Sequence, residues 1–126
     1  MEDIKYRHIS WEEVDDMVAD LAIQIAESEN TPKYIQYPKY ITGIARGGYI
    51  PSVMLSHKLN INYTDDWLLQ PLIVDEICDS GKTLKKYEDY TTAVLIYKPH
   101  TSCYEPTFSS EKYEGDDWII FPWEVK

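Results

Sequence analysis

Apolar and polar positions follow two different periods along the chain, and each period predicts a kind of element. Between residues 10 and 29, apolar side chains recur every three or four positions and acidic side chains fill the other face. This spacing predicts an amphipathic helix. Ser10 and Glu13 form an S-x-x-E capping box at its start, and residues 30–32 (Asn-Thr-Pro) are expected to end it.

Three short apolar runs farther along the chain predict buried strands, at residues 40–45, 72–74 and 92–97. Helices are predicted between them, from Pro51 to about Leu59 and from Lys82 to Tyr90. Helices that alternate with buried strands indicate an α/β fold with a parallel sheet and right-handed crossovers. After Pro99 the pattern becomes irregular until a short apolar run at residues 118–121.

Ligands of open parallel sheets bind at the carboxyl ends of the strands. The predicted order of elements places five charged residues along that edge, namely Arg46, Asp75, Glu76, Asp79 and Lys98. The sequence therefore predicts a single site where these side chains meet.

The segment from residue 72 to residue 84 contains the largest group of candidate functional residues. A buried strand leads into Asp75 and Glu76, and Asp79 follows directly before a Ser-Gly-Lys-Thr turn at the start of a helix. Repelling carboxylates favour a cation or sugar hydroxyls as ligands, and the turn offers amides, hydroxyls and a positive helix end to a phosphate. These groups together predict a phosphorylated sugar and a divalent metal. A Walker A loop is excluded, because it requires glycine where this chain has Glu76.

This segment resembles the motif that binds phosphoribosyl pyrophosphate (PRPP) in the type I phosphoribosyltransferases, where two acids precede an Asp-Thr-Gly-x-Thr turn. Ser80 stands where threonine is usual, and it keeps the hydroxyl group. Residues 44–51 (Ile-Ala-Arg-Gly-Gly-Tyr-Ile-Pro) are similar to the pyrophosphate loop of the same family. Glycines permit close approach of the backbone to an anion, and arginine supplies a planar fork of donors. The resemblance also implies a cis peptide bond between Ala45 and Arg46.

Two further segments resemble the branch of the family that uses 6-oxopurines, which are xanthine, guanine and hypoxanthine. They are Tyr97-Lys98-Pro99 at a strand end and residues 117–124 in the tail. The resemblance implies that Lys98 donates to the purine O6, that Trp118 stacks on the ring, and that the carbonyl group of Ile119 meets substituents near C2.

The resemblance implies a three-layer parallel sheet in one domain over residues 1–126, with residues 99–126 as a small base-binding hood. The implied reaction transfers 5-phosphoribosyl from PRPP to a 6-oxopurine, with Mg²⁺ as cofactor, and gives a nucleoside 5'-monophosphate and pyrophosphate. Asp75 and Glu76 would hold the ribose hydroxyls, directly or through Mg²⁺, and Asp79 would help to move a proton near the purine N7. The implied 5'-phosphate ligands are Asp79, Ser80, Gly81, Lys82 and Thr83, and the implied pyrophosphate ligands are Ala45, Arg46 and Gly47.

One part of the chain departs from the family. Residues 60–71 stand where family members have a longer flexible loop that closes over PRPP, and this segment contains no Lys or Arg. We therefore expect the lid to be reduced or absent. Tyr63 and Trp67 are the candidates for an apolar shield over the pocket.

Composition limits the partners of this chain. Twelve Lys and Arg stand against 22 Asp and Glu, a net charge of -10, which repels nucleic acid and anionic lipid at long range. No run approaches the ~20 apolar residues of a membrane helix, the first residues do not resemble a signal peptide, and Cys78 and Cys103 show no disulfide or metal spacing. We expect a cytoplasmic protein whose partners are PRPP and a purine base, without nucleic acid or membrane. The resemblance adds a homodimer, because members of the family are often dimers.

Two other interpretations stay open on the sequence alone. A binding module with the same fold that senses PRPP or a nucleotide without turnover is compatible with the short lid region. A phosphoreceiver-like domain would account for Asp75 and Lys98, but it leaves the turn at residues 80–83 and the Arg-Gly-Gly loop unexplained.

Overall fold

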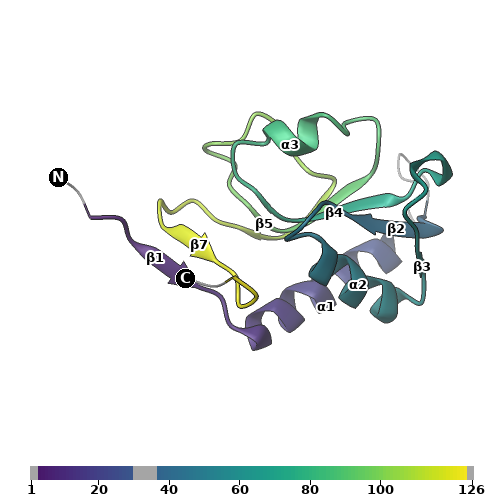
Figure 1. The fold of residues 1–126 in the computed structure, drawn as a ribbon, viewed down its shortest axis with the longest axis horizontal. Helices are drawn as coiled ribbons and strands as arrows, with labels where there is room; N and C mark the ends of the chain where they lie inside the picture. The colour runs from purple at the N-terminus through teal and green to yellow at the C-terminus, as the bar shows by residue number, and fades with distance from the viewer. Residues whose placement is uncertain (1–2, 30–36, 125–126) are drawn as a thin grey trace.

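A parallel sheet forms the centre of the computed structural model, which describes residues 3–29 and 37–124 (Figure 1). Its strand order in the described residues is β3-β2-β4-β5-β6, and every neighbouring pair is parallel. The strands are β2 (Tyr40–Gly43), β3 (Asn62–Tyr63), β4 (Leu72–Cys78), β5 (Thr92–Tyr97) and β6 (Phe108–Lys112). The parallel α/β fold that the sequence predicts is confirmed.

The two central strands, β4 and β5, bring the candidate site residues to one edge of the sheet. All six side chains of β5 are buried, as expected of a parallel strand that is covered on both faces. β4 does not end at Val74 as predicted, because its pairing with β5 continues through Asp75 opposite Val94 to Cys78 opposite Tyr97. The acids of the candidate site therefore begin inside the strand and not after it.

Two helices, α1 (Trp11–Ser28) and α2 (Tyr49–Leu59), cover one face of the sheet (Figure 1). The predicted capping box starts α1, since Ser10 Oγ accepts from the Glu13 N–H at 3.0 Å and Glu13 Oε1 accepts from the Ser10 N–H at 3.2 Å. The apolar side chains that α1 buries are Val14, Met17, Val18, Leu21 and Ile25. The segment expected to end this helix, residues 30–32, lies outside the described residues. In the described ranges no helix is both long and apolar enough to cross a membrane.

The opposite face of the sheet is covered by a thinner layer. The helix predicted from Lys82 to Tyr90 is wrong beyond its first turn, because α3 spans only Lys82–Lys85. After α3, backbone N–H groups donate hydrogen bonds to the carbonyl group three residues earlier. The Tyr90 N–H, for example, donates to the Tyr87 carbonyl at 2.9 Å. The rings of Tyr87 and Tyr90 lie 4.8 and 5.7 Å from that of Trp67. Where the sequence predicts that the helix continues, the aromatic side chains of this segment instead pack together.

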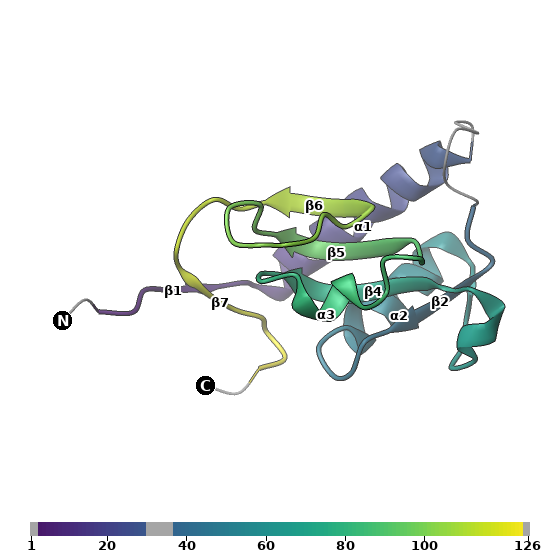
Figure 2. The ribbon, with the colours of Figure 1, turned by 90° about the horizontal axis from the view of Figure 1, so that it is seen from above.

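Figure 2 shows a second sheet of two parallel strands beyond the edge of the main sheet, and this sheet is called the hood below. It differs from the hood implied at residues 99–126, because β6 of that range joins the main sheet. It pairs β1 (Tyr6–His8) with β7 (Trp118–Ile120), so both ends of the chain build it. The sequence predicts β7 but misses β1, which is short and polar. It also misses β6, whose sequence Phe-Ser-Ser-Glu-Lys has one apolar residue; this strand joins the main sheet within a region expected to be irregular.

The buried face of α1 gives a direct test of this packing. Leu21 is 0% exposed, whereas Ile23 on the same helix is 58% exposed. Leu21→Ala should lower the free energy of unfolding by about 2–5 kcal/mol, because it leaves a cavity in the core. Ile23→Ala is the matched control and should change it by less than about 0.5 kcal/mol. Urea denaturation of both variants measures the difference, and equal effects would contradict the packing described here.

Candidate active site

Two cavities lie at the carboxyl ends of β2, β4 and β5. The larger has a volume of about 890 Å³ and is closed on one side by the hood. The smaller, about 210 Å³, lies at the turn that follows β4. Glu76, Ile77 and Asp79 line both cavities, so the two share a wall.

The structure brings most of the predicted site residues to these cavities. Those lining the larger cavity are Arg46, Gly47, Glu76, Asp79, Lys98, Trp118 and Ile119. Those lining the smaller cavity are Asp75, Glu76, Asp79, Ser80, Gly81 and Thr83. Ala45 and Lys82 are not among the lining residues, and the side chain of Lys82 is exposed.

The loop after β2 approaches the acids of β4 closely. The peptide bond between Ala45 and Arg46 is cis, as the resemblance implies. The Gly48 N–H donates to the Ile44 carbonyl at 2.9 Å and closes the loop. A Cβ atom on Gly47 would lie 2.1 Å from Glu76 Oε1, so the Glu76 carboxyl group would have to move if this residue carried a side chain.

Asp75 and Glu76 are adjacent on β4, and adjacent residues of a strand point to opposite faces. Burial raises the pKa of Asp75 to about 6, although the Glu76 N–H donates to Asp75 Oδ1 at 2.8 Å and opposes the shift. Burial likewise raises the pKa of Glu76 to about 7, opposed by a hydrogen bond from Trp123 and reinforced by the charges of Asp75 and Glu124. Both groups would hold their charge more easily beside a bound cation. A carboxylate suits Mg²⁺, which commonly binds one or two carboxylates together with substrate phosphates.

The turn after β4 is supported by a neighbouring loop. Gly81 has φ +81°, and a Cβ atom there would lie 2.4 Å from Ser102 Oγ. The Cys103 N–H donates to the Ser80 carbonyl at 2.8 Å, and the Lys82 N–H donates to Ser80 Oγ at 3.3 Å. Because α3 has only one turn, its dipole is weaker than the sequence predicts, and the amides and hydroxyls of the turn are the main groups available to an anion.

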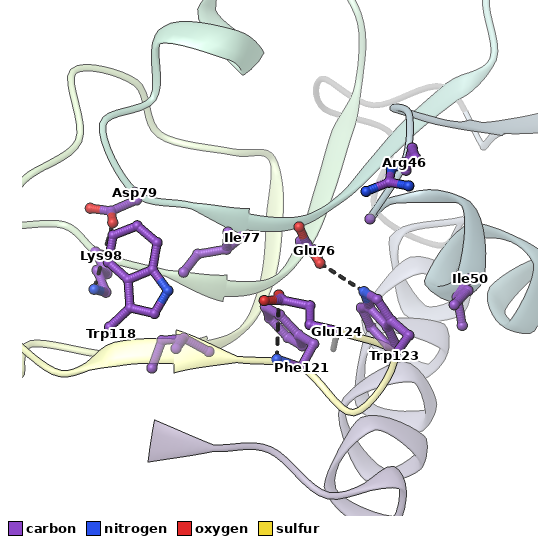
Figure 3. Close-up of a pocket in the computed structure, with 12 residues that line it drawn as sticks. Arg46, Ile50, Glu76, Ile77, Asp79, Lys98, Trp118, Phe121, Trp123 and Glu124 are labelled. Atoms are coloured by element: carbon purple, nitrogen blue, oxygen red, sulfur yellow. Dashed lines mark hydrogen bonds and ion pairs between the residues drawn. The ribbon is translucent and has the colours of Figure 1, made fainter. Parts of the chain in front are cut away.

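Lys98 and Asp79 lie together at the hood end of the larger cavity. Lys98 is 6% exposed, and its Nζ lies 3.6 Å from Asp79 Oδ2 and donates to the Asp117 carbonyl at 3.1 Å. An ammonium group has three donors, and the contact with Asp117 is its one hydrogen bond within the described residues, so a donor remains for a ligand. Thr101 Oγ1 donates to Asp79 Oδ1 at 2.8 Å. Trp118, which is 55% exposed, lines the same cavity as Lys98 and Asp79 (Figure 3).

Two residues of this site were missed in the sequence. Trp123 Nε1 donates to Glu76 Oε2 at 3.0 Å (Figure 3), and Thr101 holds Asp79. Trp123 lies in the tail segment that carries the resemblance, but only the fold brings it to a carboxyl group 47 positions earlier. Thr101 lies in a segment without a motif, and no sequence signal identifies it.

The segment at residues 60–71 does not cover the cavities. It contains β3 and one turn of 3-10 helix, η1 (Trp67–Leu69). The Trp67 ring packs on Tyr87 and Tyr90, and neither Trp67 nor Tyr63 lines either cavity. The expectation that these two side chains shield the pocket is therefore wrong, because Trp67 is held in the aromatic layer on the sheet.

The fold is that of a type I phosphoribosyltransferase. The structure superposes on a purine phosphoribosyltransferase from Pyrococcus horikoshii with a TM-score of 0.75 and 26% identity, covering 96% of this chain and 95% of that chain. A xanthine-guanine-hypoxanthine phosphoribosyltransferase from Helicobacter pylori superposes with a TM-score of 0.74 and 23% identity, over 95% of this chain and 94% of that chain.

Comparison of sequences gives the family. The xanthine-guanine phosphoribosyltransferase of Cereibacter sphaeroides is 30% identical over 115 residues, which are 68% of this chain and 68% of that protein. No model of a known protein family matches the sequence. The chain belongs to the family of the xanthine-guanine phosphoribosyltransferases.

The buried acid of β4 predicts a pH dependence of stability. A folded-state pKa of about 7 for Glu76, above its ordinary value of 4.5, means that folding favours the protonated form. The contribution of Glu76 to the free energy of unfolding is fully present below pH 4.5 and is lost as the pH rises through 7. Glu76→Gln should therefore match the wild type near pH 4.5 and exceed it at pH 8. We expect a gain of about 1–2 kcal/mol, a figure reduced for the partial exposure of the side chain.

Urea denaturation in the presence of a chelator, at both pH values, measures this effect. Glu114→Gln, at an exposed position, removes the same charge and is the matched control that should show no such gain. A loss of stability at pH 8 in Glu76→Gln would contradict the prediction.

Proposed function

We propose that this protein transfers 5-phosphoribosyl from PRPP to a 6-oxopurine (xanthine, guanine or hypoxanthine) with the help of Mg²⁺, and releases a nucleoside 5'-monophosphate and pyrophosphate. Its family and the names of its relatives support a purine phosphoribosyltransferase. The single observation that best supports the assignment is one cavity lined by Lys98 and Trp118 and also by Arg46 and Gly47. Such a cavity can hold a planar base and an anionic leaving group on either side of a sugar.

The hood end of the cavity would bind the base. The free donor of Lys98 would meet the purine O6, and Trp118 would stack on the ring, because a half-exposed indole offers its face to a planar ligand. The Ile119 carbonyl would meet substituents near C2. Asp79 would lie on the N7 side and accept or return a proton, and its contacts with Lys98 and Thr101 hold it in place for that step.

The two anionic ends of PRPP would use backbone-rich loops. The turn of residues 79–83 would bind the 5'-phosphate, chiefly through amides and the hydroxyl groups of Ser80 and Thr83, which line the smaller cavity. Residues 45–47 would bind pyrophosphate, with the Arg46 guanidinium as a planar donor. Arg46 offers positive charge to the pyrophosphate as its bond to the sugar breaks.

The acids of β4 would serve the sugar. Asp75 and Glu76 would hold the ribose hydroxyls, directly or through Mg²⁺, and would offset the positive charge that develops on the ring. When bound, Mg²⁺ supplies charge neutralisation for the pyrophosphate. Burial makes both carboxyl groups resist ionisation in the free protein, so binding of a cation there would be coupled to release of protons.

The competing interpretations are less well supported. A sensor of PRPP or a nucleotide without turnover has the same fold, but the relatives named above are transferases. A phosphoreceiver-like domain does not account for the Arg-Gly-Gly loop, which lines the larger cavity. A homodimer and residence in the cytoplasm remain predictions.

The base end can be tested by pyrophosphate release from PRPP and Mg²⁺ with single bases. Lys98→Ala should reduce the use of xanthine, guanine and hypoxanthine, since the donor to O6 is lost. Trp118→Ala should cost about 1–3 kcal/mol of base affinity through lost stacking. The exposed Lys112→Ala is the control for lost charge. Faster release with adenine than with the 6-oxopurines would refute the choice of base.

The sugar end can be tested by calorimetric titration with PRPP and Mg²⁺. Replacing Asp75 by Asn and Glu76 by Gln removes the charges and keeps the shapes, and affinity should fall by about 1–3 kcal/mol. The matched control is a double variant at two adjacent exposed acids, Glu88→Gln with Asp89→Asn. It should leave the affinity for PRPP unchanged. Equal affinity in the two double variants would refute the role of the acids.

A further inference from the structure

The tail of the chain makes a contact at the centre of the site to which the proposed function gives no role. Trp123 Nε1 donates a hydrogen bond to Glu76 Oε2 at 3.0 Å, and both residues line the larger cavity (Figure 3). In residues 3–29 and 37–124 this is the one hydrogen bond to the Glu76 carboxyl group. The tail of the chain therefore contacts Glu76, the acid assigned to the sugar, and also carries residues assigned to the base.

The position of Trp123 is determined by its surroundings. The ring stacks on that of the buried Phe121 at 5.0 Å between centroids and 8° between planes, and the Trp11 ring of α1 lies 5.7 Å away. The turn that carries Trp123 is closed by the Glu124 N–H, which donates to the Phe121 carbonyl at 3.0 Å, and by the Phe121 N–H, which donates to Glu124 Oε1 at 3.4 Å. The indole N–H is thus directed at Glu76 before any ligand binds.

The contact orients Glu76 without occupying it. A carboxylate has two oxygens with about four acceptor sites in total, and the indole uses one site on Oε2. Both carboxylate oxygens lie beside Gly47 of the pyrophosphate loop, since a Cβ atom there would be 2.1 Å from Oε1 and 2.3 Å from Oε2. The carboxyl group is held between the tail and this loop, and within the described residues Oε1 accepts no hydrogen bond.

We propose that Trp123 is a positioning residue for PRPP, whose indole N–H holds the Glu76 carboxyl group in the orientation that receives the ribose hydroxyls or their Mg²⁺. This proposal rests on the proposed function of the site. It predicts that loss of the indole N–H weakens PRPP binding and leaves the base largely unaffected, although Trp123 lies in the same segment as the base-stacking Trp118.

The test is Trp123→Phe, which removes the N–H and keeps a ring that can stack on Phe121. We expect the KM for PRPP, and its Kd with Mg²⁺ by calorimetry, to rise roughly tenfold, as for loss of a hydrogen bond to a charged group. The KM for the purine should stay within about twofold, a split that general loosening of the tail would not produce. Trp11→Phe is the matched control, because it removes an indole N–H from the same aromatic group without a contact to Glu76.

A second comparison shows whether Trp123 acts through Glu76. In a Glu76→Ala background, Trp123→Phe should cause no further change in the KM for PRPP, because the group that it orients is gone. An additive effect would overturn the proposal, as would unchanged PRPP affinity in the single variant or a rise confined to the purine KM. A wild-type protein that neither binds PRPP nor releases pyrophosphate would instead refute the proposed function itself.

Should Trp123→Phe fail to fold, the wild-type protein still gives an answer. The indole N–H signal of Trp123 in an NMR spectrum, assigned with Phe variants of the other tryptophans, should shift when PRPP and Mg²⁺ are added. An unchanged signal at saturation would overturn the proposal.

Discussion

Burial of two carboxyl groups on the central strand is the constraint on which the rest of the site depends. Desolvation alone would favour neutral acids at Asp75 and Glu76, and it raises both pKa values. Trp123 donates a hydrogen bond to the Glu76 carboxyl group, and Gly47, which has no side chain, leaves room beside it. In the proposed function, a substrate that brings hydroxyl groups and a divalent cation would complete the solvation of these acids. The free-energy cost of burying the two carboxyl groups in the free protein would then favour binding of this class of ligand.

The hood carries Trp118, which is proposed to bind the base, and contacts with the main sheet determine its position. Arg7 of β1 forms a bidentate pair with Glu111 of β6, in which Nη2 donates to Oε1 at 2.9 Å, and its guanidinium lies 5.2 Å from the centre of the Tyr113 ring. Lys98 Nζ lies 5.8 Å from the same ring. The strand that carries Trp118 is therefore tied to the sheet through the N-terminal strand. Both ends of the chain determine the geometry at the base, although only one end carries the recognisable motif.

The segment at residues 60–71 stands where the resemblance implies a longer flexible loop. Trp67 of this segment packs against Tyr87 and Tyr90 on the face of the sheet that α3 covers. Tyr87 and Tyr90 follow directly after the single turn of α3. The cluster of three rings thus joins the segment at residues 60–71 to the layer that contains α3.

Local patterns in the sequence determine the alternation of strands and helices, the capping box at Ser10, the Arg-Gly-Gly loop and the acidic strand end, because each depends on neighbours a few positions apart. Short polar strands such as β1 and β6 carry no such signal, since β6 has one apolar side chain and each strand is stabilised by its partner. The contact between Trp123 and Glu76, the support of Asp79 by Thr101 and the packing of Trp67 join distant segments. Only the tertiary structure decides these contacts, because a hydrogen bond or a ring stack depends on where the backbone places two groups in space and not on their order in the chain.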